Sequence, residues 1–247
     1  MKLCIKNRKK SAFSLIELSI VLIIIGLLIA GVTGGASLIK SSELRAVMSE
    51  ARAYATSVNG FYNQFNYLPG DFGGAIGNAS VGDADGTIEY ANAATPTPVN
   101  EGRAAWYQMK GAGIIDTSLI SAVVVPTIGA SVPGIITFGS NVPASKIKGA
   151  GWDFDYNTTT TQNVIVLTGA VPAGSASNTL VNGNLVSIGI ITPTDALAID
   201  TKIDDGSPVA GKVRGVLSTC YTATTGPYLT STTTRACALS YQIDINS

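Results

Sequence analysis

The N-terminal part of the chain contains one long, uninterrupted apolar stretch. No charged residue occurs over residues 18–39. As an α-helix this stretch would be about 33 Å long, which is enough to cross the hydrocarbon core of a bilayer. Five basic residues and no acidic residue precede Phe13, and such a cluster holds a short N-terminus on the cytoplasmic side of a membrane. The pattern therefore predicts one membrane-spanning helix, with the rest of the chain across the membrane.

After Lys40 the apolar pattern becomes one-sided. Apolar residues recur three and four positions apart, and polar residues such as Glu50 occupy the other faces. This spacing predicts an amphipathic helix that packs one face on a globular core. Pro69 and Gly70 are expected to end a single helix over residues 13–67, about 80 Å long. Its core-facing residues are predicted to be Leu44, Val47, Met48, Ala51, Ala55, Val58, Phe61, Tyr62 and Phe65.

Past residue 68 the pattern is that of strands and turns. β-branched runs alternate with Gly, Pro and Asn turn residues, which predicts an antiparallel sheet. Two short helices are expected over residues 101–115 and 192–206, the second with Thr194 as its N-cap. The predicted fold is α+β, with a long N-terminal helix packed on a C-terminal antiparallel sheet. The predicted strands cover residues 123–128, 134–139, 163–171, 184–192, 212–221 and 236–245.

Composition argues against an enzyme. The chain has no His, which excludes Ser-His-Asp and Cys-His catalysis and His-containing zinc sites. No S-x-x-K motif occurs, and the two Trp residues do not provide the aromatic-lined cleft of a glycosidase. Residues 152–156, WDFDY, are expected to form a half-buried edge strand, with part of a sugar-binding surface as the alternative. Without its basic N-terminus the chain is acidic, which gives no reason to expect a nucleic-acid site.

Two of the three Cys residues, Cys220 and Cys237, lie near the C-terminus, whereas Cys4 lies in the basic N-terminal segment. In an exported domain such a pair is typical of a disulfide that closes a local loop. A loop of this length would contribute about 3 kcal/mol on the chain-entropy model. The alternative is a pair of free thiols in a reducing compartment.

Two acidic groups are candidates for metal binding. Asp83, Asp85 and Glu89 stand in the sequence GDADGTIE, where alternating acids and a Gly resemble part of a calcium-binding loop. The stretch lacks the full 12-residue EF-hand pattern, and a polar turn is the alternative. Residues 200–205 contain a second acidic group at the end of a predicted helix, where a solvated turn is the simpler interpretation.

Glu17 stands at the start of the apolar stretch, where an unpaired carboxylate is unfavourable in lipid. A cut between Ala12 and Phe13 would create a positively charged α-amine on Phe13. That amine would lie four residues before Glu17, about 6 Å away along a helix axis. The carboxylate could then pair with the amine of its own or a neighbouring chain and set the register between identical helices. We therefore interpret Glu17 as an assembly contact.

Residues 9–31, KKSAFSLIELSIVLIIIGLLIAG, resemble the N-terminal signature of type IV pilins and type II secretion pseudopilins. That signature combines a short basic leader, a cut before Phe, and Glu as the fifth residue of the mature chain. Phe13 and Glu17 match those positions, whereas Ala12 stands where the family usually has Gly. LPGD at residues 68–71 and GDADGTI at residues 82–88 are similar to stretches in a subset of prepilin-like proteins.

The resemblance implies how the chain is processed and divided. In the family, prepilin peptidase removes the leader and methylates the new N-terminus, which here is Phe13. Residues 1–12 would be the cleaved leader, and residues 13–40 the transmembrane and filament-core helix. Residues 41–67 would be the amphipathic half of that helix, and residues 68–247 a globular α+β domain.

The expected function is that of a structural subunit of a type IV pilus or related filament, polymerised from the inner membrane for adhesion, motility, DNA uptake or secretion. The alternatives are a type II secretion pseudopilin and a membrane-anchored binding module that does not polymerise. The implied partners are prepilin peptidase, further copies of the chain and related pilins, inner-membrane lipids, and the assembly platform with its ATPase. Some pseudopilins bind calcium; no other cofactor is expected. The precursor would be a single-pass inner-membrane protein, and the mature subunit would stand in an extracellular pilus or a periplasmic pseudopilus.

Overall fold

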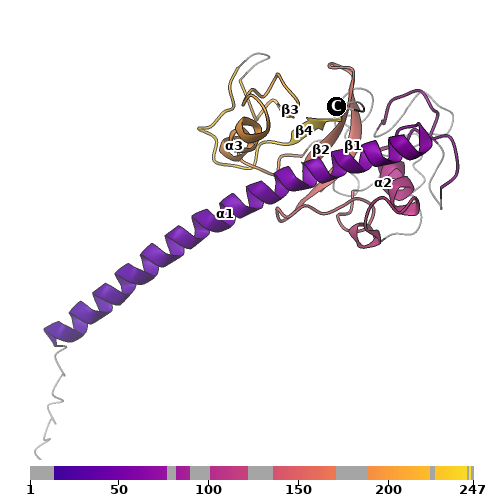
Figure 1. The fold of residues 1–247 in the computed structure, drawn as a ribbon. Helices are drawn as coiled ribbons and strands as arrows, with labels where there is room; N and C mark the ends of the chain where they lie inside the picture. The colour runs from indigo at the N-terminus through magenta and orange to yellow at the C-terminus, as the bar shows by residue number, and fades with distance from the viewer. Residues whose placement is uncertain are drawn as a thin grey trace, which may run out of the picture. The chain divides into compact units, whose positions relative to one another are not determined.

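The computed structural model describes residues 14–76, 82–89, 101–121, 136–170, 188–222, 226–243 and 245 (Figure 1). One long helix is followed by shorter helices and a four-stranded antiparallel sheet. This arrangement confirms the predicted α+β class. The helices are α1 (Leu15–Phe65), α2 (Glu101–Gly111), η1 (Thr117–Leu119) and α3 (Pro193–Ile203). The strands are β1 (Ala150–Asn157), β2 (Gln162–Gly169), β3 (Val213–Gly215) and β4 (Leu239–Gln242).

The first half of α1 belongs to a unit of its own, Met1–Ser42. Its large apolar side chains are exposed along the whole stretch, from Leu15 at 86 % to Ile39 at 65 %. Within the described part of the chain, α1 is the one helix long and apolar enough to cross a bilayer by length and composition. The surface of this half is apolar, which suits packing against lipid or other helices rather than contact with water.

The second half of α1 belongs to the unit Glu43–Ser247 and supplies one wall of its core. The buried side chains follow the predicted three- and four-residue spacing, with Tyr54 as an addition that the sequence pattern did not reveal. Asn66 adopts a left-handed conformation with φ 58°, so it ends the helix three residues before Pro69. The buried residues are Leu44, Val47, Ala51, Tyr54, Val58 and Phe61.

The sheet has the strand order β1-β2-β4-β3, and all three pairings are antiparallel. Trp152 of β1 lies opposite Leu167 of β2, and Ile165 of β2 lies opposite Tyr241 of β4. β1 is an edge strand, as expected for residues 152–156. It is buried rather than half-buried, because helices cover the aromatic side chains that it presents.

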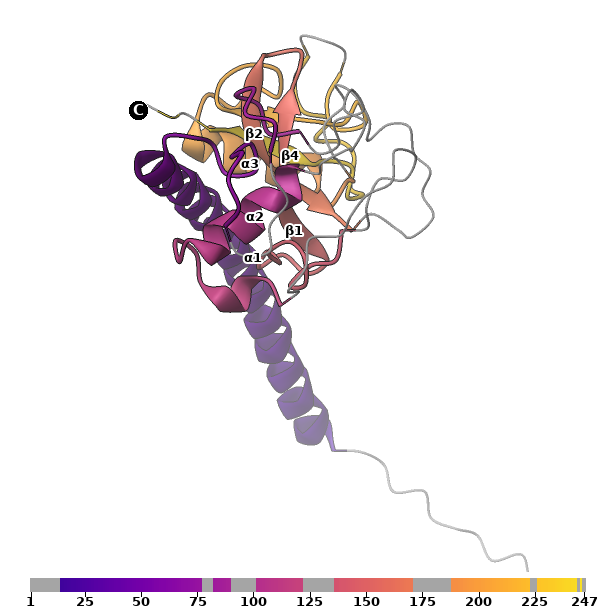
Figure 2. The same ribbon diagram turned by 90° about the vertical axis from the view of Figure 1, so that its right-hand side faces the viewer.

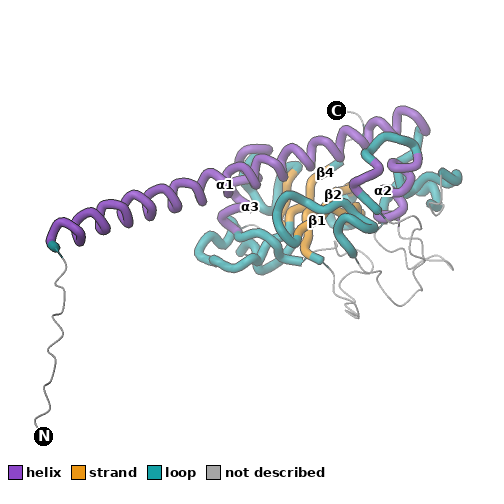
Figure 3. The backbone as a smooth tube through the Cα atoms, turned by 90° about the horizontal axis from the view of Figure 1, so that it is seen from below, coloured by secondary structure: helices purple, strands orange, loops and turns teal. Residues whose placement is uncertain are grey.

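Helix α2 and the second half of α1 lie beside the sheet (Figures 2 and 3), and aromatic side chains join them to it. The Tyr54 ring of α1 lies 4.9 Å from the Trp106 ring of α2 and 5.9 Å from the Trp152 ring of β1, measured between ring centroids. Trp106 also lies 4.4 Å from Phe154, and Trp152 lies 5.4 Å from Tyr241 of β4. Since such edge and tilted contacts add to simple burial, they fix how α1 and α2 lie on the sheet.

Parts of two predicted strands do not form strands in the structure. Over the described residues 136–139 and 188–192 the backbone makes only isolated bridges, at Phe138 and Ile191. Gly139 has φ 73° and turns the chain toward Val142, which prevents a continuous strand. The predicted strand 212–221 ends at Gly215, because the Cys220 amide turns back to the Leu217 carbonyl. The predicted strand 123–128 lies outside the described residues.

The N-cap of helix α3 lies two residues earlier than predicted. The hydroxyl of Thr192, not of Thr194, accepts a hydrogen bond from the Asp195 amide at 3.2 Å. Pro193 occupies the first helical position, where a missing amide hydrogen costs nothing. The Thr-Pro pair was therefore the better start signal in the sequence.

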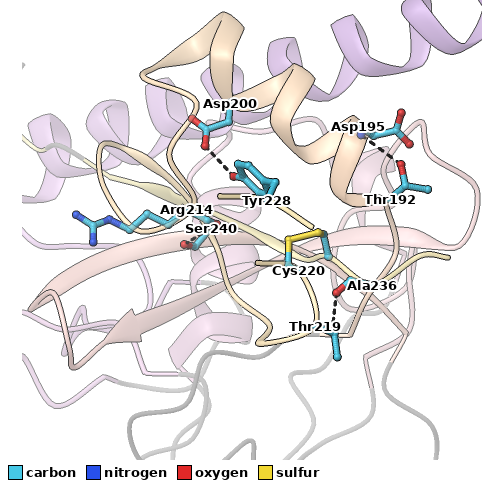
Figure 4. The surroundings of a disulfide bond; sticks show 10 residues. Thr192, Asp195, Asp200, Arg214, Thr219, Cys220, Tyr228, Ala236 and Ser240 are labelled. Carbon is cyan, nitrogen blue, oxygen red and sulfur yellow. Dashed lines mark hydrogen bonds between the residues drawn. A yellow bond between two sulfur atoms is a disulfide. The ribbon is translucent and has the colours of Figure 1, made fainter. Parts of the chain in front are cut away.

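Cys220 and Cys237 form a disulfide, with their Cα atoms 4.7 Å apart (Figure 4). Both residues are fully buried, and they stand beside the sheet rather than within it. The hydroxyl of Thr219 donates to the Ala236 carbonyl at 2.8 Å, and the Leu229 amide donates to the Cys220 carbonyl at 2.9 Å. The disulfide closes the loop that leads into β4, as the spacing of the two cysteines predicted.

Candidate functional site

Glu17, the predicted assembly residue, has a partner within its own chain. α1 begins at Leu15, which makes Ser14 the residue that caps it. The Ser14 amide donates a hydrogen bond to Oε2 of Glu17 at 2.8 Å, and the Leu18 amide donates to the Ser14 carbonyl. This is the reach-back half of a capping box, in which the acid at the third helical position satisfies an otherwise free amide. Glu17 therefore stabilises the start of α1 before any second chain is present.

The sequence contained a signal for this contact. Ser14 and Glu17 are spaced S-x-x-E just ahead of an apolar run, which is the pattern of a capping box. Glu17 also lies in the first turn of the helix, where the macrodipole favours a negative charge. Ala12 and Phe13, the predicted cleavage and methylation residues, lie outside the described residues, so that prediction stays a prediction.

A group of acids lies where the turn after α1 and the 82–89 loop meet the start of α2. One carboxylate oxygen from each of Asp71, Asp83 and Glu101 lies within 4.8 Å of the other two. Asp71 and Glu101 are 2 % and 1 % exposed, whereas Asp83 is exposed. Of the predicted calcium ligands, the structure thus places Asp83 beside two acids that the sequence pattern did not include.

The other two predicted ligands, Asp85 and Glu89, border this group. Oδ1 of Asp85 accepts hydrogen bonds from the amide and hydroxyl of Thr87, so it closes its own turn. Glu89 interacts with Glu101 and helps to raise the pKa of that carboxyl. The sequence pattern identified only the acid from the 82–89 loop, Asp83. It missed Asp71 and Glu101, because they come from segments before and after that loop.

Main-chain amides hold the acidic group together. The amides of Asp83 and Glu89 donate to the two oxygens of Glu101, at 3.1 and 3.3 Å. The Gly86 amide donates to Oδ2 of Asp71 at 3.1 Å. Burial is the main cause that raises the pKa of Asp71 to about 6, and burial followed by the nearby Glu89 raises the pKa of Glu101 to about 10. An ionised form of this group thus requires a compensating positive charge.

Two glycines allow the backbones around the acids to approach closely. Gly70 has φ 93°, and a Cβ there would lie 2.3 Å from the Glu101 carbonyl oxygen. A Cβ on Gly82 would lie 2.3 Å from the Gly70 carbonyl oxygen. Because only glycine fits at such distances, the turn after α1, the 82–89 loop and the start of α2 meet at one point.

The acidic group of Asp200, Asp204 and Asp205 lies at the C-terminal end of α3. Its buried member, Asp200, accepts a hydrogen bond from the Tyr228 hydroxyl at 2.7 Å (Figure 4). Asp200 also accepts from the Gly206 amide at 3.1 Å. Asp204 accepts from the amides of Lys212 and Val213. These contacts show carboxylates that hold the turn after α3 against β3, rather than a solvated turn as the sequence suggested.

Neither tryptophan forms a sugar-binding surface. Trp106 and Trp152 are both fully buried, and the Trp152 indole donates to Oε2 of Glu50 at 2.9 Å. Glu50 also accepts from the Ser145 hydroxyl and the Lys146 amide. The sequence pattern placed Glu50 on a polar face of α1, whereas the structure shows it as the contact that joins α1 to the sheet edge.

Comparison with protein families gives a match at the N-terminus. Residues 7–33 match the family model described as the prokaryotic N-terminal methylation motif. The chain carries the type IV pilin and pseudopilin signature. Comparisons with curated proteins and with solved structures gave no match for this chain. The matched residues contain both Ser14 and Glu17 and most of the exposed apolar stretch of α1.

The signature supports a pilin-like or pseudopilin protein that prepilin peptidase processes. It is a signature of structural subunits rather than enzymes, and it fits an inner-membrane precursor anchored by the apolar half of α1. In the pilin-like chain the motif and the domain are joined by one continuous helix, α1, which changes from exposed apolar residues to a buried face after Ser42.

Proposed function

We propose that the pilin-like chain is a structural subunit of a type IV pilus or a related filament, polymerised from the inner membrane. The observation that carries this proposal is the coincidence of the methylation motif with a helix half that has an exposed apolar surface. A membrane anchor alone needs the apolar surface but not the motif. Subunits that move from lipid into a helical bundle need both, because the same apolar side chains pack first on lipid and then on neighbouring helices.

Glu17 is the residue that connects processing to assembly. Removal of residues 1–12 would leave Phe13 with a charged amine one position before the amide that Glu17 already accepts from Ser14. An amine of a neighbouring subunit would form a charge-assisted hydrogen bond with the same carboxylate, which is stronger than the neutral amide contact. In the low dielectric of a filament core, this difference favours one axial position of the incoming subunit.

The C-terminal unit would form the outer part of the filament. Its closed disulfide and buried aromatic core make it a stable module that tolerates exposure outside the cytoplasm. We place the chain in an extracellular pilus or a periplasmic pseudopilus, with the assembly platform and its ATPase as partners during polymerisation. Adhesion, motility, DNA uptake and secretion are the functions that such a filament would serve.

The test is to shear filaments from cells that express the full chain and to identify their subunits by mass spectrometry. The expected N-terminal peptide begins at Phe13, lacks residues 1–12 and carries one methyl group. Glu17→Ala is expected to abolish incorporation while the protein remains in the membrane. Glu43→Ala changes an acid of the same helix outside the matched motif, so it serves as the control and should assemble normally.

A mature protein that still begins at Met1 would refute processing, and normal filaments with Glu17→Ala would refute the assembly role of that carboxylate. Cell fractionation separates the two filament classes, because a pilus is recovered from the sheared surface and a pseudopilus from the periplasm. Recovery of the processed chain only as a membrane monomer would favour the non-polymerising anchor.

A further inference from the structure

We propose that Asp71, Asp83 and Glu101 bind a calcium ion that joins the turn after α1, the 82–89 loop and the start of α2. The three carboxylate oxygens lie within 4.8 Å of one another. Oxygens bound to one calcium ion at its usual 2.3–2.6 Å are at most about 5 Å apart. A single ion can therefore contact all three carboxylates without a large change in the backbone.

Asp71 supplies the observation that distinguishes this group from an ordinary surface cluster. Its side chain is 2 % exposed, and Oδ1 has no hydrogen-bond partner among the described residues. Oδ2 accepts the Gly86 amide, so half of a buried carboxylate is left unsatisfied beside Asp83 and Glu101. Buried carboxylates without partners are strongly unfavourable and are normally paired or bound to a metal.

Among the described residues, the charged side chains that act on the carboxyls of Asp71 and Glu101 are other acids. Asp83 and Asp85 act on Asp71, and Glu89 acts on Glu101, and each raises the energy of the ionised acid. Five acids from the described part of the chain thus converge on one small region that two main-chain turns hold in place. A bound calcium ion would offset the repulsion between these neighbouring carboxylates.

The main chain of the 82–89 loop positions the acids for an ion. Both oxygens of Glu101 are oriented by the amides of the 82–89 loop, and Ala84 has φ 64°, a left-handed value that is unusual for alanine. This turn brings the exposed Asp83 over the two buried acids. Because Asp83 faces solvent, water molecules can complete the coordination that three carboxylates begin.

The donor set selects a hard cation. All three side chains offer oxygen, the chain has no His, and both described cysteines are in the disulfide, which disfavours zinc and copper. Magnesium requires a near-ideal octahedron at shorter distances, whereas a loop with irregular donors fits the flexible coordination of calcium. The group at the end of α3 differs, because both oxygens of its buried Asp200 are already hydrogen-bonded.

The experiment uses the full-length protein in detergent micelles, first stripped with EDTA and then titrated with CaCl₂ in a calorimeter. We expect one bound calcium per chain and a dissociation constant below about 1 mM, the range of extracellular calcium modules. Saturating calcium should also raise the unfolding temperature, because it binds the folded chain alone. MgCl₂ at the same concentration should have a smaller effect.

Asp71→Asn and Asp83→Asn should each weaken calcium binding by about tenfold or more. Asp83 is exposed, so its variant tests the site even where Asp71→Asn impairs folding. Asp205→Asn, in the acidic group at the end of α3, is the control and should bind calcium like the unmodified chain. No binding at about 5 mM calcium, equal binding by Asp83→Asn, or tighter binding of magnesium would overturn the proposal. None of these results bears on filament assembly, which is measured separately.

Discussion

Replacing Glu50 with alanine should loosen the attachment of α1 to the sheet. Glu50 accepts three hydrogen bonds, from the Trp152 indole at 2.9 Å, the Ser145 hydroxyl at 2.7 Å and the Lys146 amide at 3.0 Å. All three donors lie about a hundred residues away in the sequence, on the edge of the sheet.

The size of the effect follows from how deeply each donor is buried. Trp152 is fully buried, so its indole N–H would lose its partner without access to water, at a cost of about 1–3 kcal/mol. Ser145 is partly buried and the Lys146 region is exposed, so water can replace much of their contact. We expect a total loss of about 2–4 kcal/mol in the free energy of unfolding. Glu50→Gln keeps an acceptor oxygen and should lose about half as much.

Urea unfolding of the full chain in micelles, followed by tryptophan fluorescence, measures this loss. The chain has two tryptophans and both are buried, so their emission reports the unfolding of the core. Glu43→Ala is the matched control, since it removes an acid from the same helix at the residue before Leu44, where the buried face begins. A change of less than about 0.5 kcal/mol for Glu50→Ala would refute the role of this contact, because surface substitutions fall in that range.

Three further predictions concern the C-terminal unit. Replacing both Cys220 and Cys237 with serine should lower the free energy of unfolding by about 3 kcal/mol, measured in urea against the oxidised chain; equal midpoints would contradict it. Burial raises the pKa of Asp200 to about 6, so its stabilising contribution is present at low pH and lost as pH rises from about 4 to about 6. The free energy of unfolding of Asp200→Asn should therefore rise relative to that of the unmodified chain as pH increases across that window. A difference between the two free energies that does not change with pH would disprove this. Gly102→Ala should lower the free energy of unfolding by about 1–3 kcal/mol, because its Cβ would lie 2.3 Å from the Phe154 carbonyl oxygen. Gly60→Ala is the control, because its Cβ would meet only the Ile114 side chain at 3.7 Å. Equal melting temperatures of the two variants would count against the close approach at Gly102.

The features that sequence could predict are those with a local period or a local motif. The buried face of α1, the helix at 101–111 and strands β2 and β4 all follow from spacing of apolar residues. The N-terminal signature and the cysteine pair are local patterns of the same kind. In each case the residues that define the feature lie within a short segment, so no knowledge of tertiary contacts is needed.

The features that sequence missed depend on residues far apart in the chain. The sequence pattern places Glu50 on a polar face of α1, because its donors lie about a hundred positions later and no periodicity marks such a contact. Asp71 and Glu101 were absent from the predicted calcium ligands for the same reason. The strands expected over residues 134–139 and 184–192 had suitable composition, but the turn at Gly139 and the helix start at Pro193 interrupt pairing. Two local signals, the Ser14–Glu17 spacing and the Thr192-Pro193 pair, could have been found.

The disulfide also implies that the bond between Cys220 and Cys237 forms after export rather than during synthesis. Cys220 and Cys237 close the segment that delivers β4 to its place between β2 and β3. Thiols stay reduced in the bacterial cytoplasm and oxidise after export, so a newly made chain would hold this segment by packing alone. The covalent closure would then be added only on the far side of the membrane. Subunits trapped before export should be more sensitive to proteases at residues 216–238 than those already exported.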